Sequence, residues 1–119
     1  MIPYSRQKIS NLEIQSVIKV LKSDFLTQGP ILPNFENKLK KKVNAKYAIA
    51  VNSATSALHI ACMSLGIGKG DSVWTSSNTF VASVNCAIYC GADIDLIDID
   101  YKSYNLDIAI LETKLRIAK

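Results

Sequence analysis

Apolar residues recur at helical spacing near the start of the chain. Ser10 and Glu13 stand three residues apart, as in a capping box, and they predict the start of a helix that runs to about Lys22. The apolar residues that share one face of this helix are Ile14, Val17, Ile18 and Leu21. We therefore expect one amphipathic helix in this part of the sequence.

The segment that follows has no regular period and ends in Gly29-Pro30, so it is predicted to be an irregular loop. Pro33 lies a little further on and is well placed to open a second helix, which we expect to run to about Val43. The sequence contains no internal repeat and no low-complexity linker. Residues 1–45 are therefore predicted to form a helical N-terminal arm.

From Lys46 onward, short apolar runs alternate with helical ones, which is typical of an α/β fold with largely parallel strands. The predicted strands run from Tyr47 to Val51, from Ser72 to Thr75 and from Ile94 to Ile99. The predicted helices run from about Thr55 to Leu65, from about Phe80 to Tyr89 and from Asp107 to Ala118. Residues 46–119 would thus begin a mostly parallel sheet flanked by helices. Right-handed crossovers would place the three strands side by side.

The composition is that of a globular protein, because 49% of the 119 residues are apolar and 20% are charged. The formal net charge of +4 comes largely from one group of lysines. Its members are Lys38, Lys40, Lys41 and Lys42. They lie among apolar residues on a helical repeat, which is typical of a solvated helix face. Since aromatic residues are not interleaved with them and no nucleic-acid-binding motif is present, we expect no nucleic-acid partner.

No apolar stretch in the sequence is long enough to span a membrane, and the first residues, MIPYSRQK, lack the apolar core of a signal peptide. We therefore expect a cytoplasmic protein that has no membrane partner. The three cysteines, an odd number, would be reduced thiols in that compartment rather than a disulfide framework.

A candidate anion site lies between the first predicted strand and its helix. In the segment from Asn52 to Ser56 (NSATS), free backbone N–H groups of the helix start and three hydroxyl groups can face one anion. The glycine patterns of dinucleotide and triphosphate sites are both absent. A simple helix cap formed by Asn52 or Ser53 explains the same residues equally well.

A second feature lies one crossover later, where the segment from Ser76 to Phe80 (SSNTF) also follows a predicted strand and opens a helix. Phe80 would present its ring at the same edge of the sheet. An aromatic ring beside a phosphate site suits a flat cofactor ring that is held by stacking. The alternative is that Phe80 packs in the core.

Four segments now form a recognisable set: Asn52 to His59 (NSATSALH), Gly70 to Thr75 (GDSVWT), Thr79 to Ser83 (TFVAS) and Gly91 to Asp100. Together they resemble the DegT/DnrJ/EryC1/StrS family of sugar aminotransferases, and the resemblance covers nearly the whole chain. Three further segments are most similar to family members of pseudaminic acid biosynthesis. These are Ser23 to Pro30, Val84 to Cys90 and Tyr104-Asn105.

The resemblance implies the large domain of an aspartate-aminotransferase-like fold (PLP fold type I), with pyridoxal 5'-phosphate (PLP) as cofactor. It also implies a homodimer that transfers an amino group from glutamate to the 4-keto carbon of a UDP-linked 6-deoxy aminosugar. By the same resemblance, the residues that would bind the cofactor phosphate are Ala54, Thr55 and Ser56, and Phe80 would stack on the pyridine ring. The residues that would lie near the sugar are Thr27, Gln28 and Gly29.

The resemblance places the catalytic Schiff-base lysine beyond Lys119, and the lysines present lie in helical charge runs, in turns or near the C-terminus. We therefore expect the 119-residue chain to be inactive by itself, and Asp98 and Asp100 to be structural. In the family fold, further strands lie between the strand from Tyr47 to Val51 and the other two. Exposed strand edges, marginal stability and a tendency to aggregate are expected.

Two other interpretations remain open. One is a zinc site, because His59 and Cys62 are three residues apart on one predicted helix and Cys86 and Cys90 are four apart on another. Their apolar neighbours favour core packing of the thiols, so no metal site is predicted. The other is a small binding module that holds a phosphorylated ligand at the segment from Asn52 to Ser56 and performs no chemistry.

Overall fold

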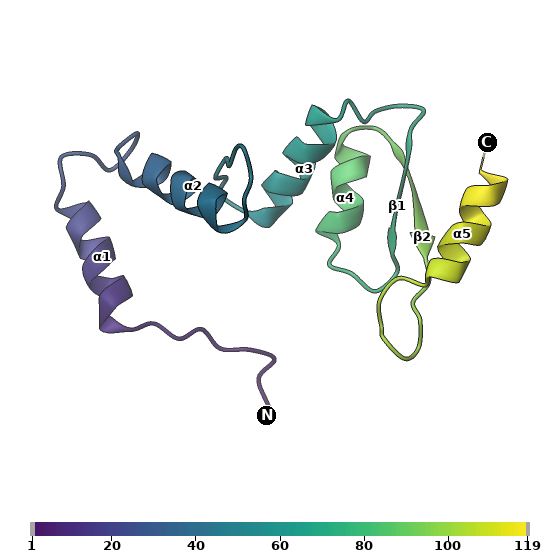
Figure 1. The fold of residues 1–119 in the computed structure, drawn as a ribbon, viewed down its shortest axis with the longest axis horizontal. Coiled ribbons are helices and arrows are strands. Elements are labelled where there is room, and N and C mark those ends of the chain that lie inside the picture. The colour runs from purple at the N-terminus through teal and green to yellow at the C-terminus, as the bar shows by residue number, and fades with distance from the viewer. Residues whose placement is uncertain (1, 119) are drawn as a thin grey trace. The chain divides into compact units, whose positions relative to one another are not determined.

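The structure is a computed structural model that describes residues 2–118. The chain divides between Ala50 and Val51 into two compact units, which are considered separately below. The first unit holds two helices, α1 (Asn11–Leu21) and α2 (Ile31–Lys42), each of which has only exposed or half-buried residues (Figure 1).

Helix α1 begins at the capping box that the sequence predicts. The backbone N–H of Ser10 donates to the Glu13 carboxylate at 2.7 Å, and the Ser10 hydroxyl accepts the backbone N–H of Leu12 at 3.2 Å. The side-chain hydrogen bond from Ser10, followed by the backbone hydrogen bond, lowers the pKa of Glu13 below its usual value. The prediction of this helix is confirmed, with its last helical residue one position before Lys22.

Helix α2 begins two residues before Pro33, with Pro30 as its N-cap residue, so the prediction that Pro33 opens the helix is wrong. Pro33 occupies the third helical position. A backbone N–H at this position would have no acceptor within the helix, so the N–H that proline lacks is not needed there. The helix ends at Lys42, one residue before the predicted end.

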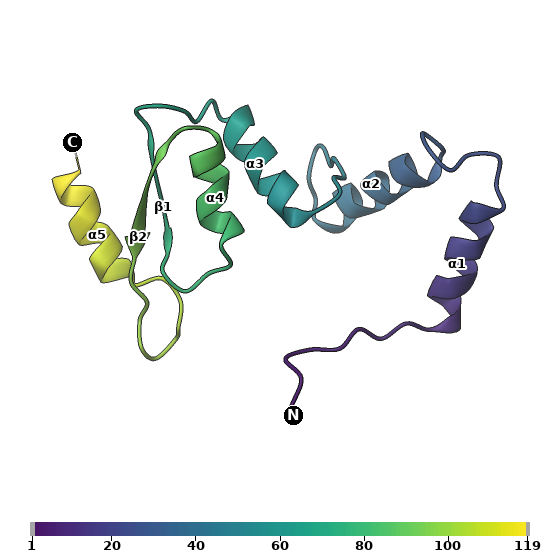
Figure 2. The same cartoon turned by 180° about the vertical axis from the view of Figure 1, so that it is seen from behind.

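The second unit is built around a β-α-β crossover of β1 (Ser72–Ser76), α4 (Ala82–Tyr89) and β2 (Asp93–Ile97). The two strands are parallel and hydrogen-bonded, with Ser72 opposite Asp93 and Ser76 opposite Ile97. Helix α4 packs against both strands, as Figures 1 and 2 show. The predicted parallel α/β arrangement is therefore confirmed for this pair of strands.

Two more helices complete the second unit. Helix α3 (Ala54–Ser64) packs against α4, and α5 (Ile108–Ile117) follows β2 (Figure 2). The core of this unit is small and consists of short side chains around one large one. Its buried apolar members are Cys62, Ala82, Cys86, Ala87, Ala92 and Ile97. None of the helices in the described part of the chain is long and apolar enough to cross a membrane.

The predicted strand from Tyr47 to Val51 is absent, which corrects the expectation of three strands side by side. These residues are neither helical nor paired in a sheet, and the side chains of Tyr47 and Ile49 are 74% and 79% exposed. A strand forms only where a second strand accepts and donates its backbone hydrogen bonds. Within this segment, the backbone N–H of Ala50 donates a hydrogen bond to the Glu36 carboxylate at 2.9 Å rather than to another strand.

The other element boundaries lie close to their predicted positions, with two informative exceptions. Helix α4 begins at Ala82 rather than at Phe80, so the Phe80 backbone lies in the turn before the helix. Strand β2 ends at Ile97, two residues before the predicted end. Ile99 instead forms an isolated antiparallel bridge with Leu106, which closes the loop that leads to α5.

Candidate functional site

The carboxyl ends of β1 and β2 define one edge of the sheet in the second unit, because the strands are parallel. The chain turns at this edge to enter α4. In Figures 1 and 2 the N-terminal ends of α3 and α4 lie toward the same side of this unit as the strand ends. Ligands of open parallel sheets bind at such an edge, so both predicted site segments occupy a suitable position.

The start of α3 leaves backbone N–H groups free. Ser53 is the N-cap residue, and its hydroxyl accepts the backbone N–H of Ser56 at 3.2 Å, while its carbonyl accepts that of Ala57 at 3.1 Å. Among the described residues, no protein acceptor is recorded for the N–H groups of Ala54 and Thr55. These two donors and the positive end of the helix are directed toward the same space, which suits an anion.

The hydroxyl groups at this helix start differ in their availability. The Ser56 hydroxyl donates to the Asn52 side-chain oxygen at 2.7 Å, and the Ser53 hydroxyl lies 3.1 Å from that of Ser56. The Thr55 hydroxyl has no recorded partner within residues 2–118, so it is the one hydroxyl of the three that is free to donate outward. The family resemblance assigned Ala54, Thr55 and Ser56 to the phosphate, which stays a prediction, and the sequence did not show that Asn52 engages Ser56.

The second loop of the site, between β1 and α4, is held by hydrogen bonds to the next strand. The backbone N–H of Ser77 donates to the Ile97 carbonyl at 2.9 Å, and the Ser77 hydroxyl donates to the Asp98 carboxylate at 3.2 Å. The hydroxyls of Thr79 and Ser83 lie 2.9 Å apart. These contacts fix the loop against the sheet edge.

Phe80 follows directly after this loop, and its side chain is 74% exposed. This exposure argues against the alternative that Phe80 packs in the core of the described structure. The ring is therefore free to cover a flat ligand at the edge where α3 and α4 begin. Its contact with such a ring stays a prediction.

Asp98 and Asp100 have structural contacts, in agreement with the sequence analysis. The Asp98 carboxylate accepts the Ile99 N–H at 2.8 Å in addition to the Ser77 hydroxyl. The Asp100 carboxylate accepts the Ser103 N–H at 2.8 Å. The side-chain hydrogen bond from Ser103 is the main cause that lowers the pKa of Asp100. Because β2 ends at Ile97, Asp98 follows directly after the strand at the carboxyl edge, a position that the predicted strand from Ile94 to Ile99 did not show.

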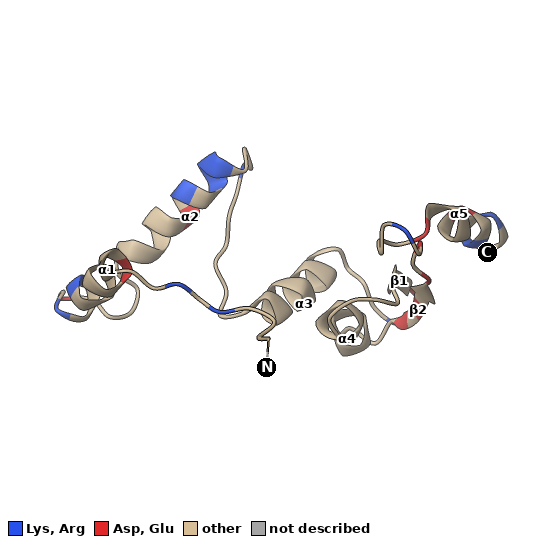
Figure 3. Cartoon of the chain, turned by 90° about the horizontal axis from the view of Figure 1, so that it is seen from below, with Lys and Arg blue, Asp and Glu red and all other residues tan. Residues whose placement is uncertain are grey.

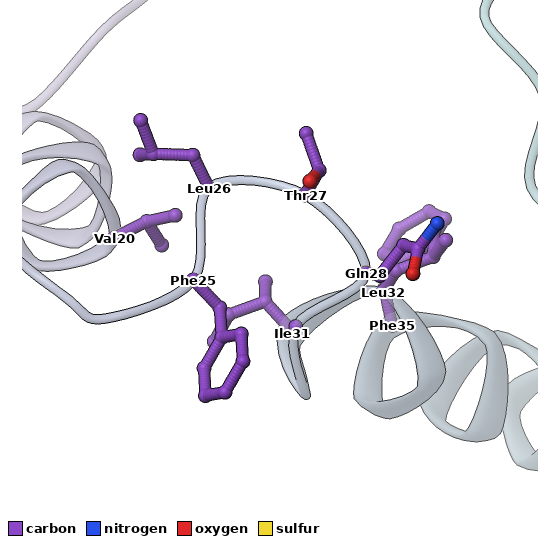
Figure 4. A pocket seen from close by; sticks show the side chains of 9 residues that line it. Val20, Phe25, Leu26, Thr27, Gln28, Ile31, Leu32 and Phe35 are labelled. Carbon is purple, nitrogen blue, oxygen red and sulfur yellow. The ribbon is translucent and has the colours of Figure 1, made fainter.

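The predicted sugar-site residues lie in the first unit, in the loop between α1 and α2. Thr27, Gln28 and Gly29 border an open apolar hollow of about 500 Å³, whose wall includes Phe25 and Phe35 (Figure 4). Gln28 adopts a left-handed backbone conformation with φ 54°. Leu26 and Thr27 extend away from the α2 helix in this view. The structure brings these three residues together in one loop, and their role toward a sugar stays a prediction.

The lysines that the structure describes are exposed, apart from two that are half-buried. Figure 3 shows one group of basic residues at the C-terminal end of α2, where half-buried Lys40 lies. The other, Lys114, is engaged: its ammonium group forms an ion pair with Asp95, donates to the Leu96 carbonyl at 3.1 Å and lies 5.6 Å from the centre of the Trp74 ring. A lysine whose ammonium group is engaged by a carboxylate and a carbonyl in this way is not free to act as a nucleophile.

The possible zinc ligands do not form a metal centre. Among residues 2–118, no group of three or more His, Cys, Asp or Glu side chains is arranged to hold a metal ion. His59 instead makes an edge-to-face contact with Tyr89, with ring centres 5.3 Å apart. The cysteines are free thiols in this structure.

Comparison with known proteins gives a consistent result. Residues 7–117 match the DegT/DnrJ/EryC1/StrS aminotransferase family. The chain is 43% identical over 111 residues to the spore coat polysaccharide biosynthesis protein SpsC of Bacillus subtilis (strain 168). The aligned residues make up 93% of this chain and 28% of that protein.

Solved structures show the same relationship. The PLP form of the putative sugar aminotransferase Spr1654 from Streptococcus pneumoniae is 31% identical, with a TM-score of 0.87 over 94% of this chain and 29% of that one. NtdA from Bacillus subtilis, with bound cofactor PMP, is 30% identical, with a TM-score of 0.80 over 88% of this chain and 25% of that one. The chain thus has the fold of the corresponding part of PLP fold type I aminotransferases, and it spans less than a third of the length of these relatives.

Proposed function

Because this chain belongs to the DegT/DnrJ/EryC1/StrS aminotransferase family, we propose that it supplies the cofactor-phosphate site of a PLP-dependent sugar aminotransferase. The observation that carries the proposal is the donor set at the start of α3. The backbone N–H groups of Ala54 and Thr55 and the Thr55 hydroxyl offer three donors at a helix N-terminus. A phosphate monoester carries three acceptor oxygens and a negative charge, so it fits this donor set.

Phe80 supports the second half of the proposal. Its exposed ring follows the loop from β1 to α4 at the same sheet edge, where it would stack on the pyridine ring of the cofactor. The cofactor, when bound, supplies the electron sink that lets an amino group pass between a donor and a keto sugar. The role of this chain would be to bind the cofactor phosphate, to orient the pyridine ring and to cover one face of that ring.

We further propose the substrate class. The amino acceptor is a UDP-linked 4-keto-6-deoxy aminosugar, the donor is glutamate, and the product enters pseudaminic acid or related surface-glycan synthesis in the cytoplasm. The support is the similarity of three segments to family members of that pathway, together with the role of the relative SpsC in polysaccharide biosynthesis. Thr27, Gln28 and Gly29 would lie near the sugar, and the working form would be a homodimer.

We also propose that the 119-residue chain does not catalyse transamination by itself. The reaction needs a lysine whose amine is at least partly neutral in a desolvated site. The described lysines are exposed or half-buried, and Lys114 is paired with Asp95. The chain alone would therefore bind the cofactor without turning over substrate.

The test is to compare the binding of pyridoxamine 5'-phosphate and pyridoxamine, which differ only in the phosphate. Neither has an aldehyde, so neither reacts with surface lysines. Ligand fluorescence at equilibrium is expected to show at least tenfold tighter binding of the phosphate ester. Thr55→Val should weaken its binding about tenfold, because a hydrogen bond to a charged group contributes roughly 1.5 kcal/mol or more.

Thr113→Val is the matched control, because the Thr113 hydroxyl donates within α5 to the Ala109 carbonyl at 2.8 Å and should leave the affinity unchanged. Equal affinity of the two ligands would contradict the proposal. Phe80→Leu separates the two candidate functions, since it removes the ring and keeps an apolar side chain. A cofactor site loses affinity for pyridoxamine 5'-phosphate in this variant, whereas a simple phosphate-binding module does not.

A further inference from the structure

Residues 47–50 of the first unit have the pattern of a strand that lacks a partner. No helix, turn or bend interrupts them, and Figure 3 shows the chain after α2 as a nearly straight stretch. Tyr47 and Ile49 are exposed, whereas Ala48 and Ala50 are half-buried. Exposure that alternates with a period of two is typical of a strand with one covered and one open face. We call residues 47–50 the extended segment.

Glu36 occupies one edge of the extended segment. Its half-buried carboxylate, on α2, accepts the Ala50 backbone N–H at 2.9 Å. In an extended chain, the backbone N–H groups of successive residues point to opposite edges. Ala48 and Ala50 therefore direct their N–H groups to the edge that Glu36 occupies. Tyr47 and Ile49 direct theirs to the other edge, where no protein acceptor is recorded for them among residues 2–118.

The two edges differ in what a second strand would meet. On the edge of Ala50, a carbonyl of an incoming strand would have to replace a carboxylate, and a charged acceptor makes the stronger hydrogen bond. On the edge of Tyr47 and Ile49, an incoming strand would displace only water. Exposed strand edges of this kind pair with strands of other chains. The extended segment can thus accept a second strand on one edge only.

The chemistry of the extended segment favours the same segment of a second copy as its partner. Its residues carry no charge, and its exposed side chains, an aromatic ring and a β-branched chain, pair well across strands. The preceding residue, Lys46, has its ammonium group 5.3 Å from the centre of the Tyr47 ring. Parallel pairing in register would place the Lys46 side chains of two copies next to each other, which is unfavourable. Antiparallel pairing places them at opposite ends.

We propose that Glu36 is a gatekeeper residue that closes one edge of the extended segment. Two copies of this chain then pair antiparallel through their open edges, and strand addition stops at two copies. Without Glu36, both edges of each segment would be open, and strands could be added without limit. This pairing needs no cofactor, so its test is independent of the proposed function.

The test compares strand addition in the parent chain and in Glu36 variants at millimolar concentration. After centrifugation removes amorphous aggregates, sedimentation of the parent chain is expected to give twice the 13.1 kDa mass of one chain. Thioflavin T, which reports stacked strands, should stay at its baseline in the whole sample. Glu36→Ala opens the second edge and should raise thioflavin T fluorescence about tenfold or more, as for other unprotected strand edges.

Two controls separate the hydrogen bond from the charge. Glu36→Gln keeps a side-chain oxygen that can accept the Ala50 N–H, so it should behave like the parent chain. Glu112→Ala removes the same charge from α5 and should also behave like the parent chain. Circular dichroism establishes that each variant keeps the helix content of the parent.

Two proline variants locate the contact, because proline removes one backbone N–H and blocks that edge of a strand. Ile49→Pro acts on the open edge and should leave the chain monomeric. Ala48→Pro, added to Glu36→Ala, closes the second edge again and should return thioflavin T fluorescence to its baseline. The proposal is overturned if the parent chain stays monomeric or binds thioflavin T, if Glu36→Ala does not bind it, or if any of the other variants departs from its expected result.

Discussion

Gly29 occupies a position that has no room for a side chain. A Cβ atom built at Gly29 would lie 2.8 Å from the Cβ of Phe25, which is closer than real Cβ contacts allow. The preceding residue, Gln28, already adopts a left-handed conformation that costs a residue with a side chain some free energy. At the scale of single residues, steric contact therefore sets the shape of the loop between α1 and α2.

A Gly29→Ala substitution should force this loop to move. We expect a loss of about 1–3 kcal/mol in local stability, as for other overpacked sites, and about tenfold faster cleavage at Phe25 or Leu26 by chymotrypsin. Gly68→Ala is the control, since a Cβ there meets its nearest neighbour, the Cys90 carbonyl oxygen, at an ordinary 3.7 Å. Equal cleavage rates of the two variants would show that the contact with Phe25 does not hold the loop.

Helix α5 contacts the sheet through one charged side chain. Lys114 forms an ion pair with Asp95 in β2, and its ammonium group lies 5.6 Å from the centre of the Trp74 ring in β1. Asp95 and Trp74 are directly opposite each other in the register of the two strands. Neither partner of the ion pair is fully buried, so the contact orients the helix more than it stabilises the fold.

This contact should depend on pH. The hydrogen bond from Lys114 is the largest cause that lowers the pKa of Asp95 below its usual value. A group whose pKa is lowered by folding stabilises the folded state above its unfolded pKa, and that contribution is lost as the pH falls through its folded pKa. We therefore expect the docking of α5 to be complete above about pH 4 and to weaken below it.

The fluorescence of Trp74, the only tryptophan, reports this change. Its emission should shift in the parent chain as the pH falls below about 4. Lys114→Met keeps a long apolar chain but removes the charge, so its emission should already be shifted at neutral pH and should not titrate in this range. Lys102→Met, in the exposed loop before α5, should behave like the parent chain. If the Trp74 emission of Lys114→Met still changed below about pH 4, the change would come from a group other than the Lys114–Asp95 pair.

At the scale of the whole molecule, the sheet is too small to cover the apolar side chains that the chain carries. The described sheet has two strands, each with one unpaired edge, and many large apolar side chains are exposed. In the first unit these include Leu12, Leu21 and Phe35, at 74%, 63% and 55% exposure. Unpaired edges and exposed apolar faces favour association, which supports the expectation that the chain alone is marginally stable.

Hydrogen exchange should reveal which extended segment is a strand. The amides of Tyr47, Ile49 and Val51 are expected to exchange at least tenfold faster than the amides of β2 that bond to β1, because they lack strand partners. The Ala50 amide should be slower than these neighbours, since it donates to the Glu36 carboxylate, and Glu36→Ala should remove the difference. Protection of the whole segment equal to that of β2 would mean that it has found a pairing partner in solution.

The sequence by itself determined the helices and the paired strands. The caps at Ser10, Ser53 and Asp107 act within three or four residues, and the apolar period of each helix is equally local. The NSATS segment was likewise recognisable as the start of a helix, while its role toward a phosphate stays a prediction. These features depend on neighbouring residues, so they can be predicted without knowing how distant parts of the chain pack.

Only the tertiary structure decided the rest. The apolar run from Tyr47 to Val51 has the composition of a strand, but a strand forms only when it is paired, and neither strand of residues 2–118 pairs with this run. The exposure of Phe80 and the contact of Ser77 with Asp98, 21 residues away, depend on how the crossover packs. Local periodicity carries no information about these distant partners, because they are set by contacts between elements.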